Sequence, residues 1–182
     1  MARSPEANYL EDTVRQLRKQ RALAEAAIAQ VDNDQLFEQI GPEVNSIATT
    51  MKHVAGNMLS RWTDFLTTDG EKPDRDRDSE FELGAEDTPA NVRARWDRAW
   101  EVTIAAIESL EPADLVRTVT IREEPHTVVE AINRQVSHYS YHVGQIVQLA
   151  KYFAGESWKS LSVPRGRSND FDVNKSGARY RA

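Results

Sequence analysis

The sequence predicts an all-α protein, a four-helix bundle with long connections and a short extended segment before the last helix. Over four stretches of the chain, apolar residues recur at intervals of three, four and seven, which is the period of a buried helical face. Residues 115–121 instead alternate in the manner of a strand and are rich in β-branched side chains. Four long amphipathic helices in one chain favour a bundle.

The first two helices are predicted from two separate apolar stripes. Gly41-Pro42 interrupts the chain between them, and proline at a first helical position suits the start of the second helix. The second stripe ends before Thr67-Thr68-Asp69-Gly70, a turn-like cluster. The stripes consist of Leu10, Val14, Leu17, Ala24, Ile28 and Val31, and of Ile47, Met51, Val54, Met58, Trp62 and Phe65.

The last two helices carry start signals as well as stripes. Thr88-Pro89 is typical of an N-cap followed by proline at the first helical position. Thr127 and Glu130 have the spacing of a capping box, and the helix that they open is expected to end near Ala154-Gly155. The stripes are Val92, Trp96, Trp100, Ile104 and Ile107, and Val128, Ile132, Val136, Tyr139, Val143, Ile146 and Ala150.

Two segments lack helical periodicity. Asp69–Asp87 holds nine acidic and three basic residues, and a loop of this length is either a solvated connector or functional. Residues 156–182 form a tail with six basic and three acidic residues and few apolar anchors. We expect a single domain over residues 1–182, with the bundle at about 5–155 and the tail at 156–182.

Composition excludes several classes of function. The 182 residues include no cysteine, which excludes disulfides, thiolate metal sites and a cysteine nucleophile. The net charge of −6 argues against a nucleic-acid partner. No apolar run reaches the roughly 20 residues of a membrane helix, and residues 1–6 do not resemble a signal peptide. We therefore expect a cytoplasmic protein.

Three of the four histidines suggest a metal site. His138 and His142 are four residues apart and share one face of the last helix, beside its apolar stripe. His53 has an equivalent offset on the second helix. Three imidazoles with open coordination positions describe a catalytic type of zinc site, and nickel, cobalt or ferrous iron would also accept them. The alternative is a pair of solvated or hydrogen-bonded histidines that meets by chance.

Other motifs are absent or weak. Ser140 and Tyr141 stand between the paired histidines, so the His-Glu-x-x-His pattern of metalloproteases is missing. Glu123-Glu124-Pro125-His126 holds only one Glu-x-x-His, and proline breaks the helix that a di-iron site would need. Arg165 lies in a short basic turn and could bind an anion, although a solvated tail explains it better.

The chain resembles the DinB/YfiT-like superfamily of four-helix-bundle metalloproteins over roughly residues 5–155. The resemblance rests on His138-x-x-x-His142-x-Gly144-Gln145-Ile146 together with His53. Several further strings resemble a bacterial branch of unknown function: Lys52-His53-Val54-Ala55-Gly56-Asn57, Arg61-Trp62-Thr63-Asp64-Phe65-Leu66, Asp69-Gly70-Glu71-Lys72-Pro73-Asp74-Arg75, Asn133-Arg134-Gln135 and Leu161-Ser162-Val163-Pro164-Arg165-Gly166.

This resemblance implies a long crossover connection and a divalent metal, zinc or nickel, held by His53, His138 and His142. Members of the superfamily include transferases and isomerases that use low-molecular-weight thiols. It thus suggests a metal-dependent enzyme acting on a small-molecule substrate, with a thiol as a second cofactor.

Residues beside the three histidines are candidates for contact with a ligand, and functions other than an enzyme are also compatible with the predicted helices. Asn57 and Gln135 project near the histidine face and could orient a ligand, and Tyr141 would line the cleft. The alternative to an enzyme is a non-catalytic bundle that binds a metal or a small ligand. Trp62, Trp96 and Trp100 suit either the core or the interface of a homodimer.

Overall fold

Five α-helices and one two-stranded sheet make up most of the computed structural model, which describes residues 4–167. The elements are α1 (Pro5–Ile28), α2 (Asn33–Phe37), α3 (Ile47–Trp62), α4 (Pro89–Glu108), β1 (Thr118–Ile121), β2 (Glu124–Thr127) and α5 (Val128–Ala154), with short 3-10 helices at Asp78–Phe81, Pro112–Val116 and Gly155–Ser157. The predicted predominance of helix is confirmed. None of the described helices is long and apolar enough to cross a membrane.

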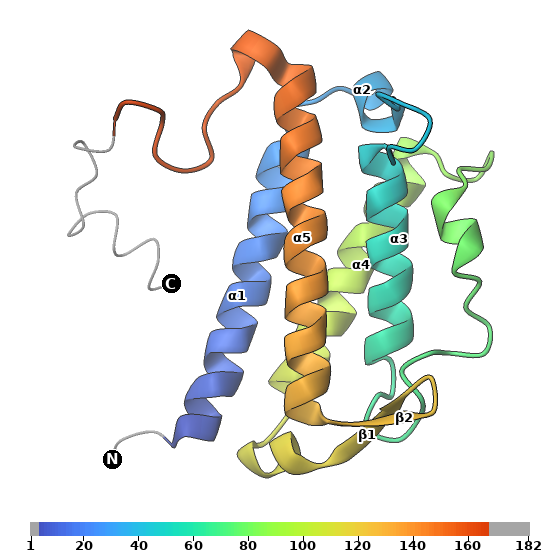
Figure 1. Cartoon of the computed structure of the whole chain (residues 1–182), viewed down its shortest axis with the longest axis vertical. Helices are drawn as coiled ribbons and strands as arrows, with labels where there is room; N and C mark the ends of the chain where they lie inside the picture. The colour runs from blue at the N-terminus through green and yellow to red at the C-terminus, as the bar shows by residue number, and fades with distance from the viewer. Residues whose placement is uncertain (1–3, 168–182) are drawn as a thin grey trace.

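The four long helices, α1, α3, α4 and α5, pack side by side, and a long connection joins α3 to α4 (Figure 1). α3 packs chiefly on α4 and also on α5, whereas α1 packs on α5 and α4. α3 and α4 run in the same direction, because residues 63–88 return along the outer side of α3 before α4 begins. The shared core includes the fully buried side chains of Leu17, Trp96, Trp100, Tyr139 and Ile146.

Most helix ends lie where the capping residues predict them. The Thr88 side chain accepts a hydrogen bond from Asn91 N–H at the start of α4, and Thr127 and Glu130 form both bonds of a capping box. α5 ends at Gly155, whose φ of 53° lies in the left-handed region that glycine adopts without a Cβ clash.

The start of α3 differs from the prediction. Pro42 lies in a turn, and the helix begins at Ile47 because Ser46 Oγ accepts the N–H of Thr49 and so caps it. The short helix α2, with Asp32 as its N-cap, occupies part of the intervening segment and was not predicted.

A hairpin supplies the missing partner of the predicted extended segment. β1 pairs antiparallel with β2, so that Thr118 faces Thr127 and Ile121 faces Glu124. The two turn residues, Arg122 and Glu123, have φ values of 56° and 64°, a conformation that usually requires glycine or asparagine. Their N–H groups donate to the carboxylate of Asp69, at 2.9 and 2.8 Å, and this contact offsets the strain.

The described part of the tail contacts the segment that follows α1. Lys159 N–H donates to the side chain of Gln30, just beyond α1, at 2.7 Å. In Figure 1 this segment is on the opposite side of the molecule from residues 63–88. Residues 168–182 of the predicted tail lie outside the described residues.

Candidate metal centre

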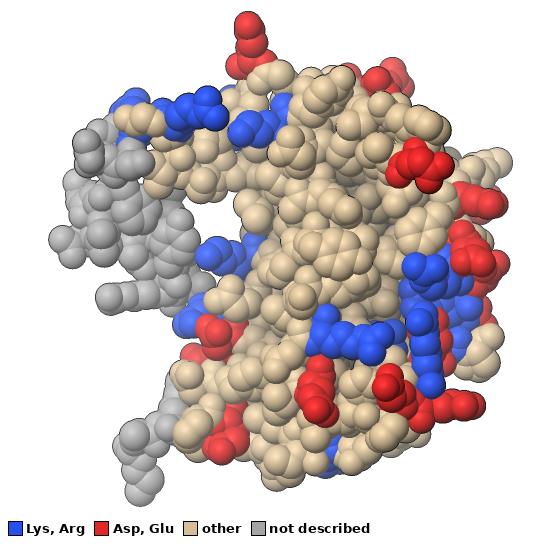
Figure 2. Space-filling model, in the orientation of Figure 1, with Lys and Arg blue, Asp and Glu red and all other residues tan. Residues whose placement is uncertain are grey.

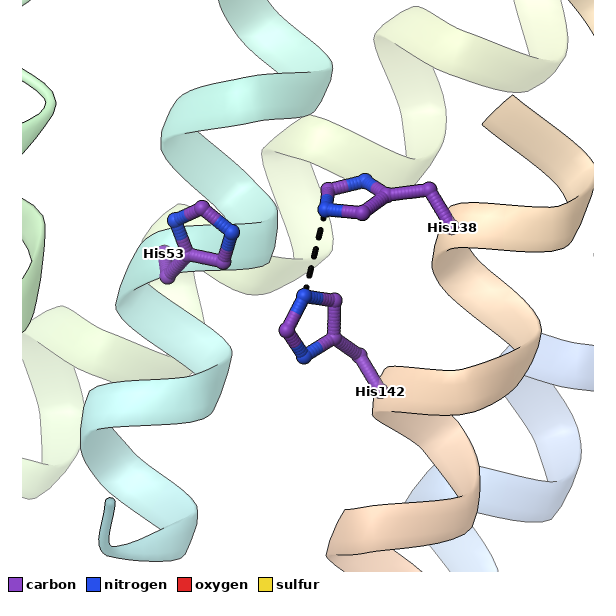
Figure 3. Close-up of side chains that lie close together, drawn as sticks. All are labelled: His53, His138 and His142. Atoms are coloured by element: carbon purple, nitrogen blue, oxygen red, sulfur yellow. Dashed lines mark hydrogen bonds between the residues drawn. The ribbon is translucent and has the colours of Figure 1, made fainter. Parts of the chain in front are cut away.

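Three histidine rings meet between α3 and α5. His53 projects from α3, and His138 and His142 project from successive turns of α5, so that the rings face one another across the gap between the helices (Figure 3). The ring centroids are 4.7–5.5 Å apart. His53 and His142 are buried, and His138 is partly exposed. The predicted convergence of these three imidazoles is therefore present.

Their nitrogen atoms fit a single cation. One ligand atom from each ring lies within 4.8 Å of the others, and the Nε2 atoms of His138 and His142 are 3.1 Å apart. Two imidazole nitrogens bound to one zinc ion at about 2.0–2.1 Å would be about 3.3 Å apart in a tetrahedral site. The α5 pair already has this spacing, and a small rotation of the side chains would close the site around His53.

Hydrogen bonds to the opposite ring nitrogens orient two of these histidines. His53 Nδ1 lies 2.9 Å from Glu80 Oε2, and His142 Nδ1 lies 2.8 Å from Gln145 Oε1. An acceptor at Nδ1 keeps the proton there and leaves the Nε2 lone pair free, as in metal-bound histidines. His138 Nδ1 is buried and has no hydrogen-bond partner among the described residues.

The surroundings keep the α5 pair neutral. Burial, together with smaller effects of the nearby rings of His142 and His53, lowers the pKa of His138 to about 3. Burial also lowers the pKa of His142 to about 4, against the opposing effect of its hydrogen bond to Gln145. Neutral imidazole is the form that binds a metal ion, so both rings are available as ligands at neutral pH.

Glu80 belongs to a buried network that starts in the long connection. Its carboxylate accepts two hydrogen bonds from Arg75, at 2.7 and 2.8 Å, besides its contact with His53. Burial alone would raise the pKa of Glu80, but the bonds from His53 and Arg75 outweigh it and lower the pKa. Glu80 is thus an anion that lies directly behind a candidate ligand. Phe81 stacks on the His53 ring with centroids 4.5 Å apart.

Gly56 makes room for this carboxylate. It lies one turn beyond His53 on α3, and a Cβ atom built there would be 2.2 Å from Glu80 Oε1 and 2.7 Å from its Cδ. Such distances are impossible without movement of Glu80. A glycine in the middle of a helix otherwise costs stability, so its presence here is explained by the carboxylate that it admits.

The connection is fastened at both ends. Near its start, Gly70 N–H donates to the Thr120 carbonyl of β1 at 2.8 Å. Near its end, the buried ammonium of Lys52 donates to Asp87 and to the Glu82 carbonyl, each at 2.7 Å. Asp69–Asp87 is therefore more than a solvated connector, since it places Glu80 at the histidines.

A cleft of about 310 Å³ adjoins the histidines. Its lining includes His53 and His138, five arginines (Arg61, Arg75, Arg77, Arg122 and Arg134) and the polar residues Asn57, Gln135, Ser137 and Tyr141. Figure 2 shows Lys and Arg side chains gathered with Asp and Glu at the lower right of the molecule, the side on which residues 63–88 and the hairpin lie.

Of the other candidate site residues predicted from the sequence, three line the cleft and one does not. Asn57 and Gln135 are buried and line the cleft; Asn57 Oδ1 accepts a hydrogen bond from Tyr139, and Gln135 Oε1 has no partner among the described residues. Tyr141 is 53% exposed and lines the cleft beside His138. Arg165 is exposed on the tail, beyond α5, and is not among the lining residues.

Glu80 and the arginines around it were not predicted from the sequence. Within Asp69–Asp87, nothing in the pattern separates Glu80 from the eight other acids. The one available signal was Gly56, an unexplained helical glycine one turn from a candidate ligand. Arg61 and Arg134 were visible only as parts of the strings that carry the family resemblance.

Comparison with known proteins places the chain in a family. The family model described as "Protein of unknown function (DUF1572)" matches residues 4–167, so the chain belongs to this family. Searches of curated proteins and of solved structures found no match.

Proposed function

We propose that this chain is a four-helix bundle of the DinB/YfiT-like superfamily and that it acts as a metal-dependent enzyme. His53, His138 and His142 would hold one divalent ion, zinc or nickel, and leave coordination positions open toward the arginine-lined cleft. The observation that carries this proposal is the convergence of three buried or partly buried imidazoles from two helices beside a cleft. The bundle and its tail would form one domain, with a location in the cytoplasm.

The arrangement of the long helices supports the proposed bundle. One hydrophobic core includes side chains from α1, α3, α4 and α5. The connection between α3 and α4 runs back along α3, and this is the long crossover that the resemblance implies. Ligands that project inward from facing helices are the usual way in which bundles build metal sites. α3 and α5 would supply all three ligands here.

The protein's own residues have distinct roles in this proposal. Glu80 fixes the tautomer and the orientation of His53 and places a negative charge behind it, whereas Gln145 does the same for His142 without a charge. Phe81 covers one face of the His53 ring and limits the access of water. A divalent ion bound here would act as a Lewis acid, lowering the pKa of a bound thiol or water, or polarising a carbonyl group.

A low-molecular-weight thiol is the proposed nucleophile, as the family resemblance implies, and the absence of cysteine from the chain is consistent with a nucleophile supplied from outside. In a transfer reaction the thiol would release its proton to solvent, and its sulfur would bond to an electrophilic carbon. The leaving group would depart with the electron pair of the bond that breaks. An isomerase would instead add the thiol sulfur to an electrophilic double bond, with the electron pair moving to a conjugated carbonyl group. The same thiol would be expelled, and the double bond re-formed, after rotation about the resulting single bond.

Metal analysis of protein purified without an affinity tag tests the proposal. We expect about one zinc or nickel ion per chain and loss of that ion in His53→Ala. The matched control is His126→Ala, because His126 lies on β2, outside the cluster. Absence of metal from the wild type, or equal metal content in the two variants, would contradict the proposed site.

A second measurement separates catalysis from a structural role. The wild type is screened with a panel of thiols and electrophiles, and His142→Ala is compared with it. We expect loss of turnover while the circular dichroism spectrum of the variant stays helical. If removal of the metal by a chelator unfolds the chain, the ion is structural, and the chain is a non-catalytic metal-binding bundle.

A further inference from the structure

Arginine side chains line the cleft beyond the histidines, on both of the helices that carry them. On α3, His53, Asn57 and Arg61 follow one another at intervals of four residues, and all three line the cleft. On α5, His138 and Arg134 repeat this spacing from the facing side. Because four residues of helix rise about 6 Å, the arginines lie about 6–12 Å along the helices from the histidines.

Arg61 is buried with unused hydrogen-bonding capacity. It is 4% exposed, and its Nε and Nη1 atoms have no partner among the described residues. Among residues 4–167, its ion pair is a long contact of 3.4 Å from Nη2 to Glu71. A buried guanidinium with unsatisfied N–H groups is costly unless a ligand or water satisfies them. Gln135 Oε1 lies on the wall of the same cleft and is also buried without a partner among the described residues; as an acceptor, it would take a hydrogen bond from an N–H or O–H group of a ligand.

The nearby carboxylates do not neutralise this surface. Among the described residues, no Asp or Glu lines the cleft. Glu71 is shared by Arg61, Arg75 and Arg122, at 3.1–3.4 Å, and Glu80 pairs with Arg75 alone among the arginines. Asp78 adds a third carboxylate, 3.8 Å from Arg77, so three carboxylates pair with this set of five guanidinium groups. Burial lowers the pKa of Arg61; the charge of Glu71 opposes this shift, and Arg134 and Arg75 add to it by smaller amounts.

We propose that this cleft binds a small organic anion, through a carboxylate or phosphate group that contacts Arg61 and Arg134. Guanidinium groups match the geometry of these oxyanions. The cleft volume of about 310 Å³ suits a metabolite-sized ligand. The orientation of this ligand rests on the proposed function: with its acidic group at the arginines, the opposite end reaches the histidines and the ion that they would hold.

Anion binding is tested by isothermal titration of the full chain, both as purified and after treatment with a chelator. Succinate and inorganic phosphate serve as probes, and succinamide is the uncharged counterpart of the first. We expect saturable binding of at least one anion and none of succinamide. Binding that is specific to succinate or to phosphate identifies the acidic group of the natural ligand.

Variants then locate the binding site. Arg134→Gln is the main variant, because Arg134 is exposed and its loss should leave the fold intact. The anion affinity of Arg61→Gln is compared with that of the wild type only if the circular dichroism spectrum of the variant is unchanged. The control is Arg98→Gln, an exposed arginine on α4, outside the cleft. A charge-assisted hydrogen bond supports a weakening of about 10-fold or more in Arg134→Gln.

Two results would overturn the proposal: no saturable binding of either anion, or equal affinity in Arg134→Gln and Arg98→Gln. Failure of the metal site gives a different result, because the chelator-treated chain would still bind the anion. Conversely, if His53→Ala protein lacks metal but still shows saturable binding of succinate or phosphate, the arginine site is supported independently of the metal site.

Discussion

Replacing Gly56 by alanine should damage the metal centre without touching a ligand. The added Cβ would lie 2.2 Å from Glu80 Oε1, whereas ordinary contacts between such atoms are longer than 3 Å. The main-chain atoms of α3 are held by the helix, so the carboxylate has to move by roughly 1 Å or more. That movement breaks its 2.9 Å contact with His53 and disturbs the two hydrogen bonds from Arg75.

The size of the effect follows from what the carboxylate does. Loss of an outer hydrogen bond to a metal-binding histidine typically costs about 10- to 100-fold in metal affinity, or about 1.4–2.7 kcal/mol. Alanine in the middle of a helix is otherwise more stable than glycine by about 0.8–1 kcal/mol. We therefore expect Gly56→Ala to bind metal more weakly than the wild type. We also expect the variant not to gain the stability of an alanine in a helix, because the ion pair between Glu80 and Arg75 is displaced.

The assay is zinc competition against a chromophoric chelator, combined with thermal unfolding. Gly144→Ala is the matched control, because Gly144 lies in α5 and a Cβ built there meets nothing within 4 Å. It should gain stability and retain its zinc affinity. Glu80→Gln retains the shape of the side chain but removes its charge, and a loss of about 10-fold in affinity would show that the charge itself matters.

One pair of results would refute this reasoning. If Gly56→Ala binds zinc as tightly as the wild type and gains as much stability as Gly144→Ala, Glu80 does not support His53. A loss of affinity in Gly56→Ala together with an unchanged Glu80→Gln would assign the effect to shape alone.

Three further predictions concern protonation and buried polar contacts. Because the pKa values of His138 and His142 are lowered to about 3 and 4, their ring NMR shifts in the metal-free protein should stay constant from pH 8 to 5, and titration near pH 6.5 would contradict the burial argument. Asp69 is desolvated, but its backbone hydrogen bonds prevail and lower its pKa to about 2, so its stabilising charge is present above about pH 4 and lost toward pH 2. Asp69→Asn should unfold about 4–8 °C lower at pH 7, a loss of about 2 kcal/mol, and this difference should vanish near pH 2 in thermal scans. Tyr139→Phe should cost about 1–3 kcal/mol in urea unfolding, because the buried Trp62 Nε1–H donates to the Tyr139 hydroxyl at 2.9 Å.

The parts of this molecule that were predictable are those in which a regular backbone determines where side chains point. Residues four apart on a helix share a face, so His138 and His142 could be paired from spacing alone. The apolar stripes then indicated which face of α3 would carry His53 beside the core. Caps such as Thr127 are local, and a short sequence contains all of their partners.

The rest depended on contacts between segments far apart in the chain. The turn at Arg122 and Glu123 contains neither glycine nor asparagine, and the group that stabilises it is Asp69, more than fifty residues earlier. Glu80 lies in a stretch without periodicity, where no face can be assigned to a side chain. Its burial depends on Arg75 and on the space at Gly56, and neither dependence leaves a repeating pattern.

The connection between α3 and α4 links the two parts of the candidate site. Glu80 orients His53 at one end of the cleft, and Glu71 holds Arg61 and Arg122 at the other; Arg75 donates to both carboxylates, at 2.7–3.1 Å. If an anion draws Arg61 away from Glu71, that carboxylate is left to Arg75 and Arg122, and because Arg75 also donates to Glu80, we predict that the change reaches His53. Because linkage is reciprocal, metal binding at the histidines should alter anion affinity at the arginines by the same factor as the anion alters metal affinity.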